Sequence, residues 1–246
     1  MNKVKIVAHR GYAGAFPENT MIAMQSAVDL GVRYLELDVQ LTSDLVPVVF
    51  HDETLERTTA GTGSILDSSW SELLTICAGE PDRFGDKFAN ETIPSLEIFL
   101  NWLSKNPGIH TFIEIKDESL DRHGYQVVLD KILPLCQSLQ SQVTLIGYDL
   151  DFLVNAREQG FSQIGWVLTK FNEQTKIQGR HHEPDFIICN YNKVNDDLWE
   201  GSWQWMFYEI TDADLAREWV EKGASFIETM EVEQLISGLD EEECSP

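Results

Sequence analysis

The sequence lacks long apolar runs and closely paired cysteines. No stretch of its 246 residues approaches the roughly 18 consecutive apolar residues of a membrane-spanning helix, so we expect no stable membrane insertion. The amino-terminal MNKVKIVAHRG has no apolar signal-peptide core, which favours a cytoplasmic location. Spacing without any CxxC is typical of reduced thiols and argues against a disulfide framework or a zinc site; the four cysteines are Cys77, Cys136, Cys189 and Cys244.

Positive charge is also scarce. Eighteen Lys and Arg residues against 41 Asp and Glu residues give a formal net charge of -23. A nucleic-acid-binding protein of this size normally carries a basic stripe, so nucleic acid is excluded as a partner. An acidic surface also repels phosphate-bearing small molecules, and a site for one would have to be locally positive. A bound divalent cation is the simplest way to achieve this, while most of the acidic residues serve solubility.

Strand-like and helix-like segments alternate along the chain. Strands are predicted at residues 5–9, 33–41, 46–50, 111–116, 142–147, 163–168, 185–189, 203–210 and 225–229. Helices are predicted at residues 19–30, 95–104, 122–139, 151–158, 212–222 and 231–239. This alternation indicates parallel strands joined by helices. Eight or so such units in about 250 residues favour an α/β fold of the closed TIM (β/α)8 barrel type over an open sheet, which periodicity alone does not exclude.

Residues 52–92 interrupt the alternation. They are rich in Gly, Thr and Asp, and we predict a loop insertion with one short helix near residues 69–77. A long excursion after a strand end is often functional. Because no internal repeat, low-complexity block or linker is visible, residues 1–246 are expected to form one barrel domain with this insertion.

Two strand segments carry charged side chains on one face. In RYLELDVQL the apolar side chains share one face, and Glu36, Asp38 and Gln40 share the other. In a barrel the apolar face meets the helices, so the carboxylates point inward. The segment TFIEIK turns Glu114 and Lys116 to the same interior. Carboxylates forced together repel unless they are protonated or bridged by a cation, and hard oxygen ligands suit Mg²⁺ or Ca²⁺.

Two histidines are predicted at the same end of the barrel. Alternation in KIVAH turns Val7 and His9 inward with Arg10 next in the chain, and Val49 and His51 are predicted to behave likewise. Catalytic residues of barrels come from the carboxyl ends of several strands. A lone histidine is usually structural, and an E-x-D strand is often a solvent face, so the prediction depends on the combination. The other histidines are predicted to be surface or loop residues: His110, His123, His181 and His182.

A set of motifs occurs in order within roughly the first 116 residues. They are HRGYAGAFPENT, ELDVQLTSDLVPVVFHD, RTTAGTG, IPSLEIFL and FIEIK. Their order and spacing resemble the glycerophosphodiester phosphodiesterase family. The resemblance implies a TIM barrel over the whole chain, with a small insertion after the second strand region. It also implies a small-molecule phosphodiester substrate, hydrolysed to an alcohol and glycerol 3-phosphate.

The resemblance further implies roles for individual residues. His9 and His51 look like the acid–base pair, and Arg10 and Lys116 look like phosphate contacts. Glu18 and Asn19 look like supports near His9 and Arg10. One divalent cation, Mg²⁺ or Ca²⁺, is implied as the cofactor, with three carboxylates as its ligands: Glu36, Asp38 and Glu114.

The second half departs from the family pattern. Gly147-Tyr148 stands where the family often has Ser-Phe, and FYEIT places Tyr208 near a family tryptophan, which makes Tyr208 a candidate pocket residue. The closing G-x-D-G-I-x-T-D becomes GASFIETM, and the Lys-Asp-Gly hairpin becomes Ser43-Asp44-Leu45. We therefore expect the pocket that recognises the alcohol to differ, and do not assume glycerophosphocholine or glycerophosphoethanolamine as the substrate.

Three other classes of protein share parts of this pattern. A lysophospholipase D-like or sphingomyelinase D-like enzyme would share the site but need an exposed apolar lip, for which the insertion offers Leu66, Trp70, Leu73, Leu74 and Phe84. A metal-dependent amidohydrolase would normally show H-x-H on the first strand, where this chain has His9-Arg10-Gly11. A non-catalytic anion-binding barrel is the third. The sequence leaves open the oligomeric state, the choice between Mg²⁺ and Ca²⁺, which histidine is the acid, and whether water or the neighbouring glycerol hydroxyl attacks.

Overall fold

Eight strands within residues 4–243, the part of the chain that the computed structural model describes, form a closed parallel barrel. Their neighbour order is β1-β9-β8-β7-β6-β5-β4-β2, and pairing of β1 with β2 closes the ring. The strands are β1 Lys5–Ala8, β2 Tyr34–Leu41, β4 His110–Ile115, β5 Val143–Gly147, β6 Ile164–Val167, β7 Phe186–Asn190, β8 Gln204–Tyr208 and β9 Ala224–Thr229. The predicted TIM barrel is confirmed, and the open sheet is excluded.

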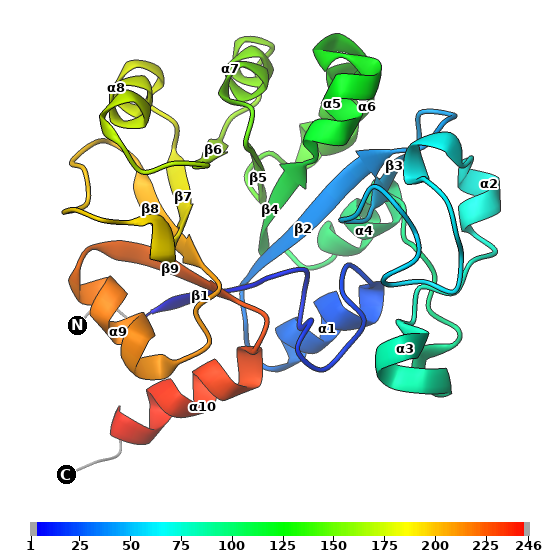
Figure 1. Cartoon of the computed structure of the whole chain (residues 1–246), viewed down its shortest axis with the longest axis horizontal. Coiled ribbons are helices and arrows are strands. Elements are labelled where there is room, and N and C mark those ends of the chain that lie inside the picture. The colour runs from blue at the N-terminus through cyan, green and yellow to red at the C-terminus, as the bar shows by residue number, and fades with distance from the viewer. Residues whose placement is uncertain (1–3, 244–246) are drawn as a thin grey trace.

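Helices follow the strands and surround them (Figure 1). The longer ones are α1 Met21–Asp29, α4 Leu96–Leu103, α5 Asp117–His123, α6 Tyr125–Cys136, α7 Leu150–Glu158, α8 Glu173–His182, α9 Ala213–Glu221 and α10 Val232–Glu243. Of the residues described, no helix is long and apolar enough to cross a membrane. The three cysteines that the structure describes are free thiols, and Cys244 lies outside the described residues.

Two helix predictions were wrong. The single helix predicted over residues 122–139 is divided at Gly124, whose φ of +78° ends α5 before α6 begins. Helix α8 was not predicted, because its buried positions are only Thr175 and Gly179 and no apolar period marks it. It begins instead at a capping box formed by Asn172 and Thr175.

The other four histidines were predicted to be surface or loop residues, and His181 is an exposed surface residue while the other three are partly buried. His181 and His182 lie in the last helical turn of α8, where cationic side chains are favourable. His110 is the first residue of β4, and its Nε2 lies 2.9 Å from the Thr144 hydroxyl. His123 ends α5. None of the four is a loop residue.

The third predicted strand, β3 Pro47–Val49, is not a barrel strand. It pairs antiparallel with β2, opposite Val39 and Leu41. The insertion then follows, with η1 Ile65–Asp67, α2 Trp70–Leu73, α3 Pro81–Phe84 and η2 Gly85–Phe88, where one short helix was predicted. It has an apolar cluster of its own, made by Val48, Phe50, Leu55, Ile65, Leu73, Ala78 and Ile93.

Apolar side chains form two layers, one inside the barrel and one between strands and helices. The inner layer contains Val7, Phe112, Ile146, Val167, Phe186, Ile188, Met206 and Phe226. Alternate residues of β2 belong to the outer layer, as predicted: Leu35, Leu37, Val39 and Leu41. The inner layer fills the barrel beneath the charged side chains, so the charged residues lie at the mouth.

The insertion does not present a continuous apolar surface. Leu66 and Leu73 are buried, Trp70 and Phe84 are half-buried, and Leu74 is the exposed member of the set, at 46% of its surface. A lipid-binding lip would need several of these side chains exposed together. The geometry therefore gives no support to the lipid-substrate alternative.

Candidate active site

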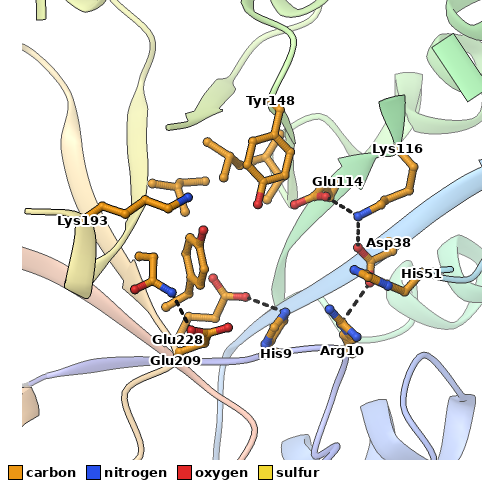
Figure 2. Close-up of a pocket in the computed structure, with 15 residues that line it drawn as sticks. His9, Arg10, Asp38, His51, Glu114, Lys116, Tyr148, Lys193, Glu209 and Glu228 are labelled. Atoms are coloured by element: carbon orange, nitrogen blue, oxygen red, sulfur yellow. Dashed lines mark hydrogen bonds and ion pairs between the residues drawn. The ribbon is translucent and has the colours of Figure 1, made fainter. Parts of the chain in front are cut away.

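A cavity of about 360 Å³ opens at the carboxyl ends of the barrel strands (Figure 2). Seven of the ten residues predicted to form the site line it: His9, Arg10, Asp38, His51, Glu114, Lys116 and Tyr208. Glu36 lies behind them, and its carboxylate accepts a hydrogen bond from the Arg10 backbone amide at 3.0 Å. The barrel thus gathers side chains that are as far apart in the chain as His9 and Tyr208.

The three predicted metal ligands form one cluster. Asp38 on β2 and Glu114 on β4 are direct neighbours in the sheet, and Glu36 lies two residues before Asp38 on the same face. One carboxylate oxygen of each lies within 4.8 Å of the others. Glu36 and Asp38 are almost completely buried, each 2% exposed. Period-two alternation of a strand buried on both faces produces this cluster.

Two cations border the cluster. The Lys116 Nζ lies 2.9 Å from Glu114 Oε1 and 3.5 Å from Asp38 Oδ1. The Arg10 Nε lies 3.3 Å from Asp38 Oδ2. Burial would raise the pKa of Asp38, but Arg10 and Lys116 outweigh burial and hold that pKa well below its usual range. Asp38 is therefore the member of the cluster that stays ionised most firmly.

The other buried carboxyls are short of positive charge. Burial and the charge of Asp38 raise the pKa of Glu36 well above its ordinary value, and they raise that of Glu114 to about 7. A fourth carboxyl, Glu228 on β9, has its pKa raised to about 8 by burial and then by Glu114. Four carboxyls face two cations, so the cluster carries an excess of negative charge when ionised.

This donor set fits a hard divalent cation. Glu36, Asp38 and Glu114 offer only carboxylate oxygens, which Mg²⁺ and Ca²⁺ prefer. A doubly charged ion among them would offset the negative charge that, after burial, raises the pKa values of Glu36 and Glu114. A second grouping, His9 with Glu36 and Glu228, also lies within 4.8 Å but mixes nitrogen with oxygen. The oxygen-only group is the better match to the predicted cofactor.

His9 follows β1 and faces the acidic cluster, as predicted. Its Nε2 lies 3.6 Å from Glu228 Oε1 and 3.9 Å from Glu36 Oε2. Burial, reinforced by neighbouring Arg10, lowers the pKa of His9 to about 3. Its imidazole is therefore neutral at neutral pH and can accept a proton.

His51 reaches the cavity by a different route from the one predicted. Val49 lies in the outer apolar layer, opposite Val39, so strand alternation does not turn His51 inward. The strand ends at Val49, and the Phe50 amide donates to the Asp38 carbonyl at 3.0 Å. The chain then leaves the sheet and brings His51 to the cavity from an irregular segment.

A network of charged side chains holds His51. Its Nδ1 lies 2.6 Å from Asp52 Oδ1, and Asp52 accepts hydrogen bonds from Arg57 Nε and Nη2 at 2.6 and 2.9 Å. Arg57 also donates to both oxygens of Glu18, at 2.7 and 2.8 Å, and Glu18 accepts from Arg10 at 2.8 Å. The predicted support residue Glu18 therefore joins Arg10 to His51 through a continuous chain of ion pairs.

Asn19, the second predicted support residue, holds Asp38. Its side-chain amide donates to Asp38 Oδ2 at 2.9 Å, and its side-chain oxygen accepts from the Asp38 backbone amide at 3.2 Å. The Asn19 backbone amide also donates to the Arg10 backbone carbonyl at 3.0 Å. Its φ of +56° lies in the left-handed region, which asparagine tolerates better than most residues.

Three charged residues that contact or adjoin the predicted ones were not predicted: Asp52, Arg57 and Glu228. Asp52 lies in the HD motif and Arg57 in the RTT motif. The motifs therefore marked both residues, but they did not indicate which side chains these residues contact. Glu228 stands in SFIET, where the same alternation that predicted Glu36 would have turned it inward.

Polar residues from the second half form the opposite wall. Tyr208 lines the cavity, as predicted, and shares a side-chain hydrogen bond with Tyr148. Burial raises the pKa of Tyr148 to about 12. Lys193 and Glu209 complete this wall, and Asn190 Nδ2 donates to Glu209 Oε2 at 2.5 Å. Glu209 has a φ of +66°, a backbone conformation that side chains of its type rarely adopt.

Known proteins with similar sequences or structures carry related names. A glycerophosphodiester phosphodiesterase of Caldanaerobacter subterraneus subsp. tengcongensis is 48% identical over 98 residues, 39% of this chain and 40% of the relative. The uncharacterized protein YqiK of Bacillus subtilis is 36% identical over 153 residues, 61% of this chain and 60% of the relative. The chain therefore matches between 40% and 60% of the length of these two relatives.

Solved structures match over nearly the whole chain. A phosphodiesterase of Oleispira antarctica in complex with the product sn-glycerol-3-phosphate has a TM-score of 0.85 at 23% identity and covers 96% of each chain. A glycerophosphodiester phosphodiesterase of Agrobacterium tumefaciens has a TM-score of 0.78 at 25% identity, covering 95% of this chain and 99% of that one. The first of these likenesses concerns the fold alone.

A family model supplies the assignment. The model of the glycerophosphoryl diester phosphodiesterase family matches residues 9–162, which is more than half of the 246 residues and runs from His9 past Lys116. The match includes the two cavity histidines, His9 and His51. It also includes the three clustered carboxylates and the side chains of Arg10 and Lys116. The chain belongs to the glycerophosphoryl diester phosphodiesterase family.

Proposed function

We propose that this protein is a metal-dependent glycerophosphodiester phosphodiesterase, and that residues 1–246 form the single barrel domain that carries the activity. Its substrate is a small phosphodiester, and its products are an alcohol and glycerol 3-phosphate. The observation that carries the proposal is the gathering of His9 and His51 with the carboxylate cluster, Arg10 and Lys116 in one cavity. The product named for the Oleispira antarctica structure supports glycerol 3-phosphate as the product here.

Arg10 and Lys116 bind the phosphate group. The guanidinium of Arg10 and the ammonium of Lys116 both lie at the cavity wall beside Asp38. They therefore present positive charge to an anion, and their ion pairs with Asp38 fix their positions. Fixed donors stabilise negative charge that develops in a transition state, because they need no reorganisation during the reaction. Charge-assisted hydrogen bonds to phosphate oxygens are also stronger than neutral ones.

His9 and His51 divide the proton transfers. One accepts the proton of the attacking oxygen, and the other protonates the leaving alkoxide. Asp52 fixes the ring of His51 through Nδ1, which leaves Nε2 free for the substrate. His9 keeps a neutral imidazole because of its burial and Arg10.

The carboxylate cluster would hold the cation. Glu36, Asp38 and Glu114 would bind Mg²⁺ or Ca²⁺, which when bound would supply Lewis-acid polarisation of the phosphoryl oxygens. Asn19 fixes Asp38 through two hydrogen bonds, so at least one ligand is held in place by its neighbours.

The test is release of glycerol 3-phosphate from a panel of glycerophosphodiesters. We expect release with added Mg²⁺ or Ca²⁺, its loss with EDTA, and its return when the metal is restored. Glu36→Gln should reduce release by at least about 10²-fold, because it removes a charged ligand. Equal release with EDTA and with metal would refute the metal dependence, and no release from any diester would refute the activity.

A matched control distinguishes the ligand from acidic charge in general. Glu97→Gln makes the same chemical change at an exposed position of α4, away from the cavity. We expect its release of glycerol 3-phosphate to equal that of the unmodified protein within about twofold, as for surface substitutions in general.

A further inference from the structure

We propose that the wall formed by Lys193, Glu209 and Asn190 is a subsite for a zwitterionic headgroup, one that carries both an ammonium and a carboxylate, as the serine of glycerophosphoserine does. The inference rests on the proposed function and names the substrate class of that cavity. It concerns the half of the cavity in which this sequence departs most from the family pattern.

Lys193 and Glu209 reach the same cavity from adjacent strands. Lys193 ends η4 Tyr191–Lys193, the turn directly after β7, and Glu209 directly follows β8. The two strands are paired, with Asn190 opposite Tyr208. Figure 2 shows Lys193 entering the cavity from the side opposite Lys116 and Arg10. A phosphodiester bound by Arg10 and Lys116 would have one of its two ester substituents facing this wall, and the proposal assigns that substituent to the headgroup.

The charges of this wall are available to a ligand. Within the described part of the chain, no carboxylate lies within 4.0 Å of the Lys193 ammonium. The Glu209 carboxylate takes its one side-chain hydrogen bond from neutral Asn190, and it forms no ion pair with a described residue. Lys116, by contrast, is paired with two carboxylates. Lys193 and Glu209 thus form no direct ion pair with each other.

One charge of each sign favours a ligand with both. A headgroup with an ammonium alone would match Glu209 but face Lys193, and an anionic headgroup would match Lys193 but face Glu209. Repulsion between a headgroup charge and a like charge of the site weakens binding of the wrong headgroup, and charged sites discriminate between ligands in this way. An amino-acid headgroup places its carboxylate toward Lys193 and its ammonium toward Glu209. The cavity, at about 360 Å³, is of a size for a small ligand.

The test compares kcat/KM for three diesters whose headgroups are zwitterionic, cationic and uncharged. They are glycerophosphoserine, glycerophosphoethanolamine and glycerophosphoglycerol. We expect glycerophosphoserine to be preferred over glycerophosphoethanolamine by about tenfold or more, the effect of one added charge-assisted contact. Preference for glycerophosphoglycerol, or equal rates for the three, would overturn the proposal while leaving the phosphodiesterase activity established.

Two variants assign the charges. Lys193→Met should lower the ratio of the serine to the ethanolamine diester about tenfold, and Glu209→Gln should lower the ratio of the ethanolamine to the glycerol diester about tenfold. Lys131→Met, at an exposed position of α6, is the control for loss of a lysine. If Lys193→Met lowers all three diesters equally, Lys193 is a phosphate contact and the proposal is wrong.

A binding measurement separates this proposal from the proposed function. Calorimetry with O-phosphoserine and phosphoethanolamine, with Mg²⁺ present, reports the subsite without turnover. We expect O-phosphoserine to bind about tenfold more tightly, and Lys193→Met to abolish the difference. If no diester is hydrolysed but this difference is found, the activity fails and the subsite stands. Equal binding of the two ligands overturns the subsite.

Discussion

The two sides of the cavity are built differently. On the side of β1, β2 and β4, each charged group is held by another, as in the chain from Arg10 through Glu18 and Arg57 to Asp52. On the side of β7 and β8, Lys193 and Glu209 form no ion pair with any residue that the structure describes, and Asn190 donates a side-chain hydrogen bond to Glu209. A network of mutual contacts fixes geometry, which suits chemistry that every substrate shares. Charges without ion-pair partners suit recognition of the part that varies between substrates.

The two sides should respond differently to substitution. Buried charges must be paired and hydrogen-bonded, so a change at one residue of the network disturbs its neighbours. Side chains at the exposed wall can change without leaving a partner buried and unpaired. We therefore expect substitutions on the first side to affect turnover of all substrates, and substitutions on the second side to affect their ranking.

The largest effect is expected from the two histidines. His9→Ala or His51→Ala should each lower kcat for every diester by about 10²- to 10⁴-fold, because each removes one proton-transfer group. The effect should fall mainly on kcat, with KM little changed, since the phosphate contacts remain. Release of glycerol 3-phosphate under saturating substrate measures it.

His181→Ala is the matched control for this prediction. His181 lies in the last turn of α8 and is exposed, outside the cavity. Its variant should keep the unmodified rate, and the far-ultraviolet circular dichroism of all three variants should be unchanged. A cavity histidine whose replacement left kcat within a few-fold of normal would contradict the assignment of that histidine.

Strand alternation explains which site residues the sequence could predict. Glu36, Asp38, Glu114 and Lys116 lie on or directly after barrel strands, so a period of two sets the direction of each side chain. The same rule placed His9 correctly. It was wrong for His51, because β3 is antiparallel to β2 and ends before that residue, and local sequence does not report strand direction.

The remaining errors come from contacts between distant segments. The ion pairs of Arg57 with Glu18 join residues 39 positions apart, and no local pattern specifies such a contact. Helix α8 was missed because few of its side chains are buried. The wall of Lys193 and Glu209 depends on how the turns after β7 and β8 enter the cavity, which the folded barrel decides.

A smaller effect on turnover is expected from Asp52. Asp52→Asn should lower kcat by about 10- to 100-fold, the usual range for a group that orients another, because the ring of His51 loses its charged partner. The loss should be similar for every diester, since Asp52 belongs to the shared network. The ratio of the kcat values for diesters with different headgroups measures whether the loss is the same for all of them.

Asp121→Asn, at an exposed position of α5, controls for the loss of one acidic charge. Its kcat should stay near that of the unmodified protein. If Asp52→Asn changed the ranking of headgroups and left kcat unaltered, the network would not be dedicated to the shared chemistry, and the contrast between the two sides would fail.

The smallest effect is on stability, and it depends on pH. Burial opposes ionisation of Glu18, but Arg57 and Arg10 outweigh it and lower its pKa below the ordinary value of 4.5. A carboxyl with a lowered folded-state pKa stabilises the fold above its unfolded pKa, and that contribution is lost as pH falls through the folded value. Glu18→Gln should therefore lower the free energy of unfolding by about 1–3 kcal/mol at neutral pH.

In acid, the free energy of unfolding of Glu18→Gln should approach that of the unmodified protein. As pH falls through the lowered folded-state pKa, the Glu18 carboxyl becomes protonated in the folded protein too, and a protonated glutamate resembles glutamine in charge. Denaturant unfolding at neutral pH and at about pH 4 measures the narrowing, with Glu97→Gln as the control for an exposed acid of α4. A difference that stayed constant between these pH values would mean that Glu18 acts through packing alone. The narrowing would instead locate part of the fold's stability in the ion pairs that join Arg10 to His51, so that one network serves both the folded state and the reaction.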